Sequence, residues 1–404
     1  MKIIPSTNTS GEGDAAIVPS PDKVSMHVRG IARTDFRVMR EATALVEAGF
    51  SVSIVDVENE RSRPVAEDIR GVCIKHIIRP QMFIPARFKP WFLIKAAQMI
   101  ILGTVQLLRT RADIYHAHDV MALPACYLAA RLRRKPLIFD AHELPLDEPG
   151  IIRWRRLSAL SMRVLGRMLQ HCAGVITTSP YYAQEIRNCY HVPEVALVCN
   201  VPTYRVVGKS DRLRQHLGLG PEVRIALYQG YLQPDRSLDR LIRAAVFLER
   251  DTVIVMMGKG DGATLSQLEA LIASEGVADR VKILPPVPYE ELLDWTASAD
   301  IGLTLFSPAY SLSIRMTLPN KLFEYLMAGL PVLTSSLDAI VAVINTYDVG
   351  QVVTSLAPAN IGAAINSMLA DHEALARLRR NALEAARHEF HWEKESQELV
   401  SGSL

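Results

Sequence analysis

Small and charged residues follow two apolar runs in the second half of the chain. Tyr228-Gln229-Gly230 ends the first run, Arg236 comes six residues after that glycine, and Gly258-Lys259-Gly260 ends the next run. Glycines at such places let a ligand approach the backbone, and the N-terminus of a following helix attracts phosphate. The pattern indicates an anion site, although a glycine after a strand is often only part of a turn.

A second segment, residues 318–332 (LPNKLFEYLMAGLPV), combines the start of a helix with two charged side chains. Pro319 and Asn320 begin the helix, and Lys321 lies in its first turn, where a cation opposes the helix dipole. A bound anion beside Lys321 would offset that cost. Glu324, one turn later, is placed to accept hydrogen bonds from a pair of hydroxyls. An ordinary surface helix is compatible with the same residues.

Polar groups occupy similar places in the first half. Three segments carry them: 35–38 (DFRV), which opens a helix, and 116–119 (HAHD) and 140–143 (DAHE), which end apolar runs. Arg37 and Glu41 have the i, i+4 spacing of a helix-face ion pair. His142 and Glu143 are compatible with a contact to a ligand or with the capping of a helix.

The histidines raise the question of a metal site. His116, His118, Asp140 and His142 are expected at neighbouring strand ends, where ligation is conceivable. No further cluster of ligand residues accompanies them, and the five cysteines form no CxxC pair. We therefore expect no metal. We interpret His116 as a packed histidine whose side chain points away from that of His118.

These residues need a scaffold that brings strand ends together. Apolar runs alternate with helical stretches twice along the chain, as in parallel strands joined by helices. The 404 residues, 49% of them hydrophobic, are enough for two cores. The fold class is α/β with two Rossmann-like domains, whose ligands bind at the carboxyl ends of the strands. We expect five parts: a flexible arm (1–22), an N-terminal domain (23–202), a linker (203–222), a C-terminal domain (223–380) and a C-terminal helix (381–404) that crosses back toward the N-terminal domain.

Composition excludes several classes of protein. Lysine and arginine number 45 and aspartate and glutamate 43, and the net charge of +2 is too small for a dedicated nucleic-acid binder. The scattered cysteines are typical of reduced packing thiols, and residues 1–22 contain no apolar secretory segment. Both features indicate a cytoplasmic protein.

Two segments bear on membrane contact. The apolar stretch Trp91–Leu108 is barely as long as the ~20 residues that span a bilayer, and Lys95 interrupts it, so we predict a buried or interfacial helix. Residues 153–167 carry five arginines, with Val164 and Met168 on an apolar face. These arginines form either a solvated helix face or a contact with an anionic bilayer. Peripheral attachment to the inner face of the cytoplasmic membrane is thus a second option for the location.

Segment 318–332, with the strand ends before it, resembles the donor-binding domain of GT-B-fold glycosyltransferases of the retaining family-four type, in the subset with a PNKxFEY sequence. Glu324 matches the second of that family's two glutamates, which binds the donor ribose, and Met316 stands where the first would be. Arg236 occupies the lysine position of the family's Arg-Lys pair for the pyrophosphate, and Tyr231 replaces the arginine. In this comparison Lys321 substitutes for part of the missing positive charge.

The first half is similar to the same family. Residues 35–42 match its D-x-R-V-x-x-E-A opening, and residues 140–143 resemble its DAHE segment. His118 matches the active-site histidine that approaches the transferred sugar. The similarity extends over roughly residues 24–399, nearly the whole chain.

The resemblance implies an enzyme of glycan biosynthesis that binds its substrates between two domains. It would transfer a sugar, with retention, from a nucleotide-diphosphate sugar to a glycan, a lipid-linked glycan or a small molecule, without a cofactor and without a metal. The resemblance assigns the catalytic roles to His118, Glu324, Lys321 and Arg236. The implied donor-binding residues are Gly230, Tyr231, Gly258, Gly260, Pro286, Met316, Leu318, Pro319 and Asn320. The implied acceptor-side residues are Arg33, Asp35, Arg37, Asp119, His142 and Glu143.

Three alternatives use the same residues. A GT-B-fold nucleotide-sugar epimerase would need an acid-base pair, for which Asp119, Asp140 and Glu143 are available. A metal hydrolase would lose its activity to a chelator. A non-catalytic partner protein with the same fold would account for the missing glutamate and arginine. The sequence leaves the nucleotide base, the sugar, the acceptor and the oligomeric state open.

Overall fold

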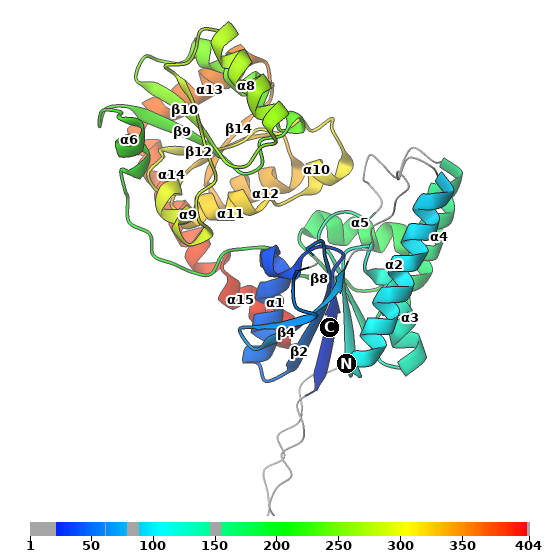
Figure 1. The fold of residues 1–404 in the computed structure, drawn as a ribbon. Coiled ribbons are helices and arrows are strands. Elements are labelled where there is room, and N and C mark those ends of the chain that lie inside the picture. The colour runs from blue at the N-terminus through cyan, green and yellow to red at the C-terminus, as the bar shows by residue number, and fades with distance from the viewer. Residues whose placement is uncertain (1–21, 61, 79–88, 146–154, 402–404) are drawn as a thin grey trace, which may run out of the picture. The chain divides into compact units, whose positions relative to one another are not determined.

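The computed structural model describes residues 22–60, 62–78, 89–145 and 155–401. The chain divides into two compact units (Figure 1). The first, the N-terminal unit, contains Met1–Val198 together with Ser396–Leu404, and the second, the C-terminal unit, contains Cys199–Glu395. The predicted arm at 1–22 lies, apart from Asp22, outside the described residues.

The N-terminal unit is built on a sheet of eight strands in the order β3-β4-β2-β1-β5-β6-β7-β8. All neighbouring strands are parallel except β3, which pairs with β4 in the antiparallel direction. The strands are β1 (Lys23–His27), β2 (Ser51–Glu58), β3 (Ala66–Ile69), β4 (Val72–Ile78), β5 (Ile114–His118), β6 (Leu137–Ala141), β7 (Gly174–Thr177) and β8 (Ala196–Leu197).

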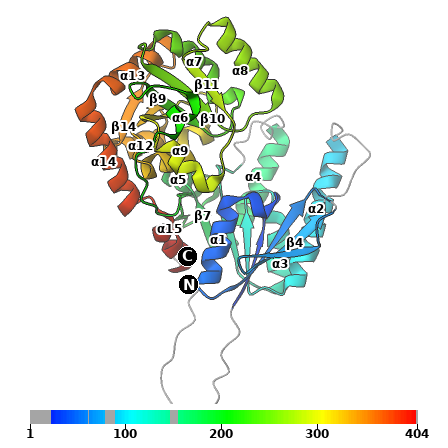
Figure 2. The same cartoon turned by 60° about the vertical axis from the view of Figure 1, so that its left-hand side comes forward.

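Helices cover both faces of this sheet. They are η1 (Ala32–Thr34), α1 (Phe36–Glu47), α2 (Lys89–Thr110), α3 (Leu123–Arg133), α4 (Arg155–Leu169) and α5 (Pro180–Tyr190). Helices α2 and α3 pack together on the face opposite α1 (Figures 1 and 2). Because both faces are covered, central strands such as β5 and β6 are buried at every position.

The C-terminal unit contains a parallel sheet of six strands in the order β11-β10-β9-β12-β13-β14. The strands are β9 (Arg224–Gln229), β10 (Thr252–Met257), β11 (Val281–Leu284), β12 (Ile301–Thr304), β13 (Val332–Ser335) and β14 (Gly350–Val353). Its helices are α6 (Arg212–Leu217), η2 (Pro234–Arg236), α7 (Leu238–Ala244), η3 (Ala245–Phe247), α8 (Gly262–Ser274), α9 (Tyr289–Thr296), α10 (Leu312–Met316), α11 (Asn320–Met327), α12 (Asp338–Tyr347), α13 (Pro358–Ala370) and α14 (His372–His388).

The strand order creates a crossover point in each sheet. In the N-terminal unit the chain winds outward from β1 in one direction and from β5 in the other, and in the C-terminal unit it does so from β9 and β12. Helices that follow two such strands lie on opposite faces, which leaves space beyond the strands' carboxyl ends for a ligand. Several of the predicted site residues end or follow these strands: Asp119 comes after β5, Gly230 and Tyr231 come after β9, and His118 is the last residue of β5.

The end of the chain differs from the predicted single helix. Helix α14 ends at His388, and a separate helix, α15 (Trp392–Ser401), begins in the C-terminal unit and ends in the N-terminal unit. The ring of Phe390, between the two helices, lies 5.1 Å from the rings of both Phe323 and Tyr347, so the chain is anchored at the break. The predicted linker at 203–222 likewise contains helix α6.

Helix α2 contains the apolar stretch that the sequence identified, now bounded by Lys89 and Thr110. Within the described part of the chain, no helix combines the length and the apolar character that crossing a bilayer requires. Helix α4 differs in one detail from the predicted apolar face: among its residues 161–169, whose side chains the structure describes, Leu165 and Leu169 are buried, whereas Val164 is 42% exposed.

Candidate active site

Glu324 is held by a chain of hydrogen bonds in the C-terminal unit. The amide nitrogen of Gln229 donates to Glu324 Oε2 over 2.6 Å, and Gln229 Oε1 accepts from the hydroxyl of Thr296 over 2.7 Å. Gln229 is the last residue of β9 and Thr296 the last of α9. The carboxylate is therefore fixed at the carboxyl end of β9, where it can accept ligand hydroxyls.

Lys321 lies one turn before Glu324 and is almost buried, with 9% of its surface exposed. Its ammonium nitrogen is 3.7 Å from the ring centre of Tyr228 and 5.1 Å from that of Phe306. Arg236 stands beside it, with its guanidinium carbon 5.0 Å from the Phe306 ring. Two cationic side chains thus share one aromatic surface at the crossover point between β9 and β12.

The charge on Lys321 is costly in this environment. Burial lowers the pKa of Lys321 well below its usual value, the guanidinium of Arg236 lowers it further, and Glu324 only partly opposes them. The attraction of an ammonium group to the face of an aromatic ring is weaker than the cost of removing that group from water. Burial is the larger effect. A bound anion beside Lys321 and Arg236 would therefore stabilise the charged form of Lys321.

Two glycines beside Lys321 occupy positions where a side chain would not fit without a change in the surrounding structure. Gly230 adopts φ +123°, which other residues rarely reach, and a side chain there would meet Lys321 Nζ at 3.3 Å. A Cβ on Gly258 would lie 1.8 Å from the carbonyl oxygen of Gly230. The ends of β9 and β10 therefore touch backbone to backbone, which only glycine at 258 permits.

The other predicted donor residues differ in their exposure and in their position relative to Lys321 and Glu324. Tyr231 is 62% exposed, and its carbonyl accepts a hydrogen bond from the Tyr228 hydroxyl. Asn320 opens α11 on the surface and Leu318 is buried just before it, while Met316 ends α10. Gly260 packs against Leu265, and Pro286 is exposed after β11. The roles of these residues stay predictions.

Two residues of this arrangement escaped the sequence analysis. Phe306 supplies a ring to both cations, and Thr296 fixes the amide that holds Glu324. Phe306 comes two residues after strand β12, a position that a scan of strand ends would flag. Nothing in the sequence marks Thr296, because only the packing of α9 brings it to Gln229.

The N-terminal unit gathers a buried charged cluster at the carboxyl ends of β5 and β6. Arg37, in α1, binds Asp140 through two hydrogen bonds of 2.8 and 2.6 Å. The same carboxylate lies 3.1 Å from His118 Nδ1 and 2.9 Å from His142 Nε2. Glu41 completes the cluster, 3.0 Å from the Arg37 guanidinium. The predicted Arg37–Glu41 pair is present, but in the core and not on a surface.

Burial and pairing distribute charge unevenly in this cluster. Burial raises the pKa of Glu41 to about 8, with Arg37 opposing it. Burial would also raise the pKa of Asp140, but Arg37 and His142 hold it well below its usual value. Burial would lower the pKa of His142, but Asp140 and Asp119 outweigh it and raise that pKa to about 9. Near neutral pH, Asp140 is therefore an anion between two cations.

The two histidines of β5 correct an expectation. Residues i and i+2 of a strand share a face, and the rings of His116 and His118 are stacked with centres 4.4 Å apart. The interpretation that they point in opposite directions is wrong. His118 has no exposed surface, and burial lowers its pKa. A direct contact between His118 and a sugar would need rearrangement of its neighbours, so its catalytic role stays a prediction.

One group of described residues has ligand atoms close enough for a metal ion. Glu41, His116, His118 and Asp140 each offer an atom, and these atoms lie within 4.8 Å of one another. The cluster already contains a positive charge, because the Arg37 guanidinium lies 2.6 Å from Asp140 and 3.0 Å from Glu41, and this charge would repel a metal ion. Arg37 is the cation that this cluster is built around.

The remaining acceptor-side residues are dispersed. Asp35 caps α1 by accepting from the backbone of Arg37 and Val38. Arg33 pairs with Glu58, at the end of β2, outside the His118 cluster. Asp119 follows β5 and lies 3.3 Å from His142 Nδ1. Glu143 is exposed after β6. Asp119 therefore belongs to the cluster around Asp140, whereas Arg33 forms a separate ion pair with Glu58.

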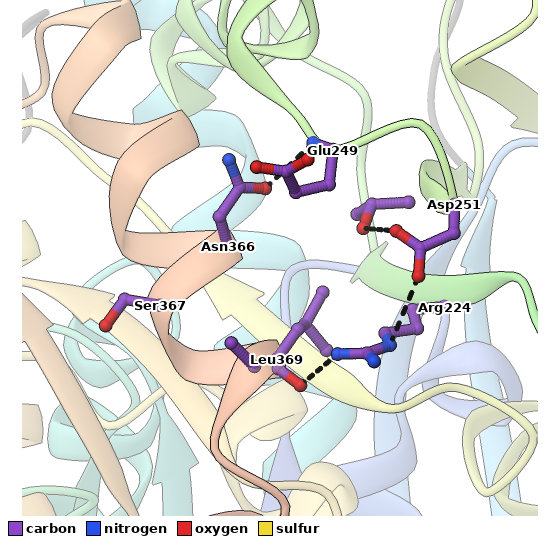
Figure 3. Close-up of a pocket in the computed structure, with 8 residues that line it drawn as sticks. Arg224, Glu249, Asp251, Asn366, Ser367 and Leu369 are labelled. Atoms are coloured by element: carbon purple, nitrogen blue, oxygen red, sulfur yellow. Dashed lines mark hydrogen bonds and ion pairs between the residues drawn. The ribbon is translucent and has the colours of Figure 1, made fainter.

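A hollow of about 520 Å³ lies elsewhere on the C-terminal unit. Figure 3 shows that its polar groups face one another: Arg224 contacts Asp251 and the carbonyl of Leu369, and Asn366 accepts from the backbone of Glu249. Arg224 begins β9 and Thr252 begins β10, so the hollow is at the amino ends of the strands. Ligands of such sheets bind at the opposite ends, and we do not assign a site here.

Comparison with known proteins identifies the family of the chain. Residues 36–201 match the family model for Glycosyltransferase Family 4, and residues 209–385 match that for glycosyl transferases group 1. The chain is 24% identical over 374 residues to D-inositol 3-phosphate glycosyltransferase of Thermobispora bispora, covering 88% of this chain and 85% of the relative. The corresponding protein of Nocardia farcinica is 25% identical over 382 residues, covering 90% and 82%.

Solved structures share the fold. Sucrose-phosphate synthase from Thermosynechococcus elongatus superposes with a TM-score of 0.76 at 16% identity, covering 94% of this chain and 97% of that one. Anabaena HepE in complex with UDP-glucose gives 0.69 at 15% identity, covering 94% and 98%. The chain thus belongs to the GT-B-fold glycosyltransferases of the family-four type. It is a glycosyltransferase that depends on a nucleotide sugar.

Proposed function

We propose that the C-terminal unit binds a nucleotide-diphosphate hexose, in the first instance a UDP-sugar, and that the enzyme transfers the sugar with retention. The observation that carries the donor site is that Lys321 and Arg236 lie over the same ring, that of Phe306, while the carboxylate of Glu324, three residues after Lys321, is held by Gln229. The cations suit a diphosphate, and Glu324 suits the two ribose hydroxyls. Binding of UDP-glucose by the similar HepE supports the choice of uridine.

The same cations would stabilise the leaving group. As the bond between the sugar and the diphosphate breaks, negative charge grows on the phosphate oxygens, and preorganised cations lower the barrier for such a step. With two side-chain cations in place, we propose that no metal is needed. Unchanged turnover after dialysis against EDTA would support this point, and loss of turnover that Mg²⁺ restores would contradict it.

A ligand screen with variants tests the donor site. We expect one of UDP-, GDP- and dTDP-glucose to raise the melting temperature, because a ligand at a hundred times its dissociation constant stabilises a protein by about 2.7 kcal/mol. Glu324→Ala and Lys321→Ala should each lower turnover at least tenfold, or about 1.4 kcal/mol. Gly262→Ala is the control, since a side chain there meets nothing within 4 Å.

The alternatives give different results in the same screen. Conversion of the nucleotide sugar without any acceptor would identify an epimerase. Binding without turnover would identify a non-catalytic protein, and equal turnover in both alanine variants and the wild type would reject the assigned residues. Proton NMR of the product decides between retention and inversion at the anomeric carbon.

We also propose that the acceptor is lipid-linked and that the N-terminal unit docks on an anionic membrane. Helices α2, α3 and α4 contain nine lysine and arginine residues and no aspartate or glutamate. On α2, Ile94, Ile101 and Val105 form an apolar stripe with exposed fractions of 52%, 61% and 42%. Leu132, on α3, is also exposed, and α3 packs against α2. Basic charge around an apolar stripe suits an anionic bilayer.

Sedimentation with lipid vesicles tests the docking. We expect the protein to bind vesicles that contain phosphatidylglycerol and not vesicles of phosphatidylcholine alone. The double variant Ile101→Glu/Val105→Glu should bind at least tenfold more weakly, while Val246→Glu, on an exposed apolar residue of the C-terminal unit, should bind like the wild type. Equal binding of the double variant would reject the surface, and turnover only with a soluble acceptor such as inositol phosphate would reject the lipid-linked acceptor.

A further inference from the structure

Lys321 is a buried amine without an acidic partner. Among the residues that the structure describes, no hydrogen bond or ion pair is made by its ammonium group, whose neighbours are the rings of Tyr228 and Phe306 and the backbone of Gly230. A lysine in such surroundings favours its neutral form, because no carboxylate or carbonyl compensates the lost hydration.

Of the two charged groups that act on Lys321, Arg236 favours the neutral form and Glu324 opposes it. Arg236, on η2, is the charged group from another element that lowers the pKa of Lys321, because it repels a second cation. Glu324, on the same helix, is the one acid among the charges that influence Lys321, and Gln229 binds its carboxylate. The hydroxyl of Tyr228, on β9, donates away from the amine to the carbonyl of Tyr231. Burial and Arg236 accordingly lower the pKa of Lys321 well below its usual value.

We propose that Lys321 rests as a neutral amine and takes up one proton from the solvent when the donor diphosphate binds beside it. This inference rests on the proposed donor site. The two negative charges of the diphosphate replace the missing partner, so the ammonium form becomes the stable one in the complex. Donor binding and protonation are then linked, and the affinity for the donor falls as the pH rises through the range in which only the complex is protonated.

Calorimetry of the full-length protein measures this proton directly. The probe is whichever of UDP-, GDP- and dTDP-glucose binds most tightly in the screen above, because their phosphates are diesters that take up no proton near neutral pH. Titrations in HEPES and in Tris, which differ in ionisation enthalpy, should give different binding enthalpies that correspond to uptake of up to one proton. The dissociation constant should rise by up to tenfold per pH unit.

Two variants assign the proton to this side chain. Lys321→Arg keeps a cation at the site, and because a guanidinium is always protonated, it should bind the donor with the same enthalpy in both buffers. Arg236→Gln removes the repelling neighbour, so the resting amine regains part of its proton and uptake on binding should decrease. Gly262→Ala should take up as much proton as the wild type.

The outcomes separate this inference from the donor site itself. Buffer-dependent enthalpy in the wild type and its loss in Lys321→Arg support the inference. Tight binding with equal enthalpies in the two buffers overturns the inference and leaves the donor site standing. Buffer dependence that persists in Lys321→Arg places the proton elsewhere and also overturns it. Absence of binding by all three donors overturns both proposals.

Discussion

The candidate site residues of the two units differ in how their charges are balanced. In the C-terminal unit, Lys321 and Arg236 both lie over the Phe306 ring, and among the described residues no acid forms an ion pair with Lys321, whereas in the N-terminal unit the Asp140 carboxylate lies between Arg37 and His142. The first arrangement is incomplete without an anion. The second is complete within the protein, and its polar contacts hold the ends of β5 and β6 in place.

The pKa of His142 predicts a pH dependence of stability. Asp140 and Asp119 raise it to about 9 in the folded protein, against 6.5 in an unfolded chain. The folded state binds the proton more tightly, so this contribution is fully present below pH 6.5 and is lost as the pH rises through 9. We expect His142→Gln to cost roughly 2–3 kcal/mol at the acidic end of this range and little at the alkaline end.

Urea unfolding of both proteins at the two ends of the range measures this difference. The relevant transition is the one that a nucleotide sugar does not shift, because it belongs to the N-terminal unit. His171→Gln, at an exposed histidine of the same unit, is the control. A constant gap between His142→Gln and the wild type would show that His142 does not carry a raised pKa.

At the scale of elements, the ends of β9 and β10 are joined by a contact that leaves no room for a side chain. Gly258→Ala would place a methyl group 1.8 Å from the Gly230 carbonyl oxygen, so the turn beside Lys321 must move. We expect donor affinity and turnover to fall at least tenfold, about 1.4 kcal/mol. Calorimetry with the nucleotide sugar measures the effect, and normal affinity in Gly258→Ala would contradict the proposed position of the diphosphate.

At the scale of the whole molecule, α15 belongs to both units. Its first residues lie in the C-terminal unit, where Cys199 N donates to the Glu395 carboxylate, while residues from Ser396 onward pack with the N-terminal unit. The chain thus leaves the N-terminal unit after Val198 and returns to it at its end. Stability of the N-terminal unit therefore depends on residues far from it in sequence.

Leu399 tests that dependence because it is 7% exposed. Leu399→Ala should destabilise the N-terminal unit by about 2–5 kcal/mol through the cavity it leaves, with donor binding unchanged. Differential scanning calorimetry with and without the nucleotide sugar separates the two units, since the ligand stabilises only the unit that binds it. Exposed Gln397→Ala is the control, and equal melting of Leu399→Ala and the wild type would show that the helix end contributes nothing.

The fold class, the presence of two α/β units and a set of candidate donor residues could be predicted from the sequence alone. Parallel α/β sheets bury both faces, so their strands appear as continuous apolar runs, and Gly230, Gly258 and the 318–332 segment stand directly after such runs. The family resemblance rested on the same residues, and the matching family models confirm it. These features are local in sequence, and local patterns can be read without knowledge of packing.

The contacts between those residues could not be predicted from the sequence, because they depend on packing between distant segments. The buried state of Lys321 depends on Tyr228 and Phe306 from two other elements, and the position of Glu324 depends on Gln229, 95 residues away. Arg37 reaches Asp140 across 103 residues, so a spacing that predicted a surface ion pair became part of a buried network. Burial and pKa follow from packing between distant segments, and no local pattern contains that information.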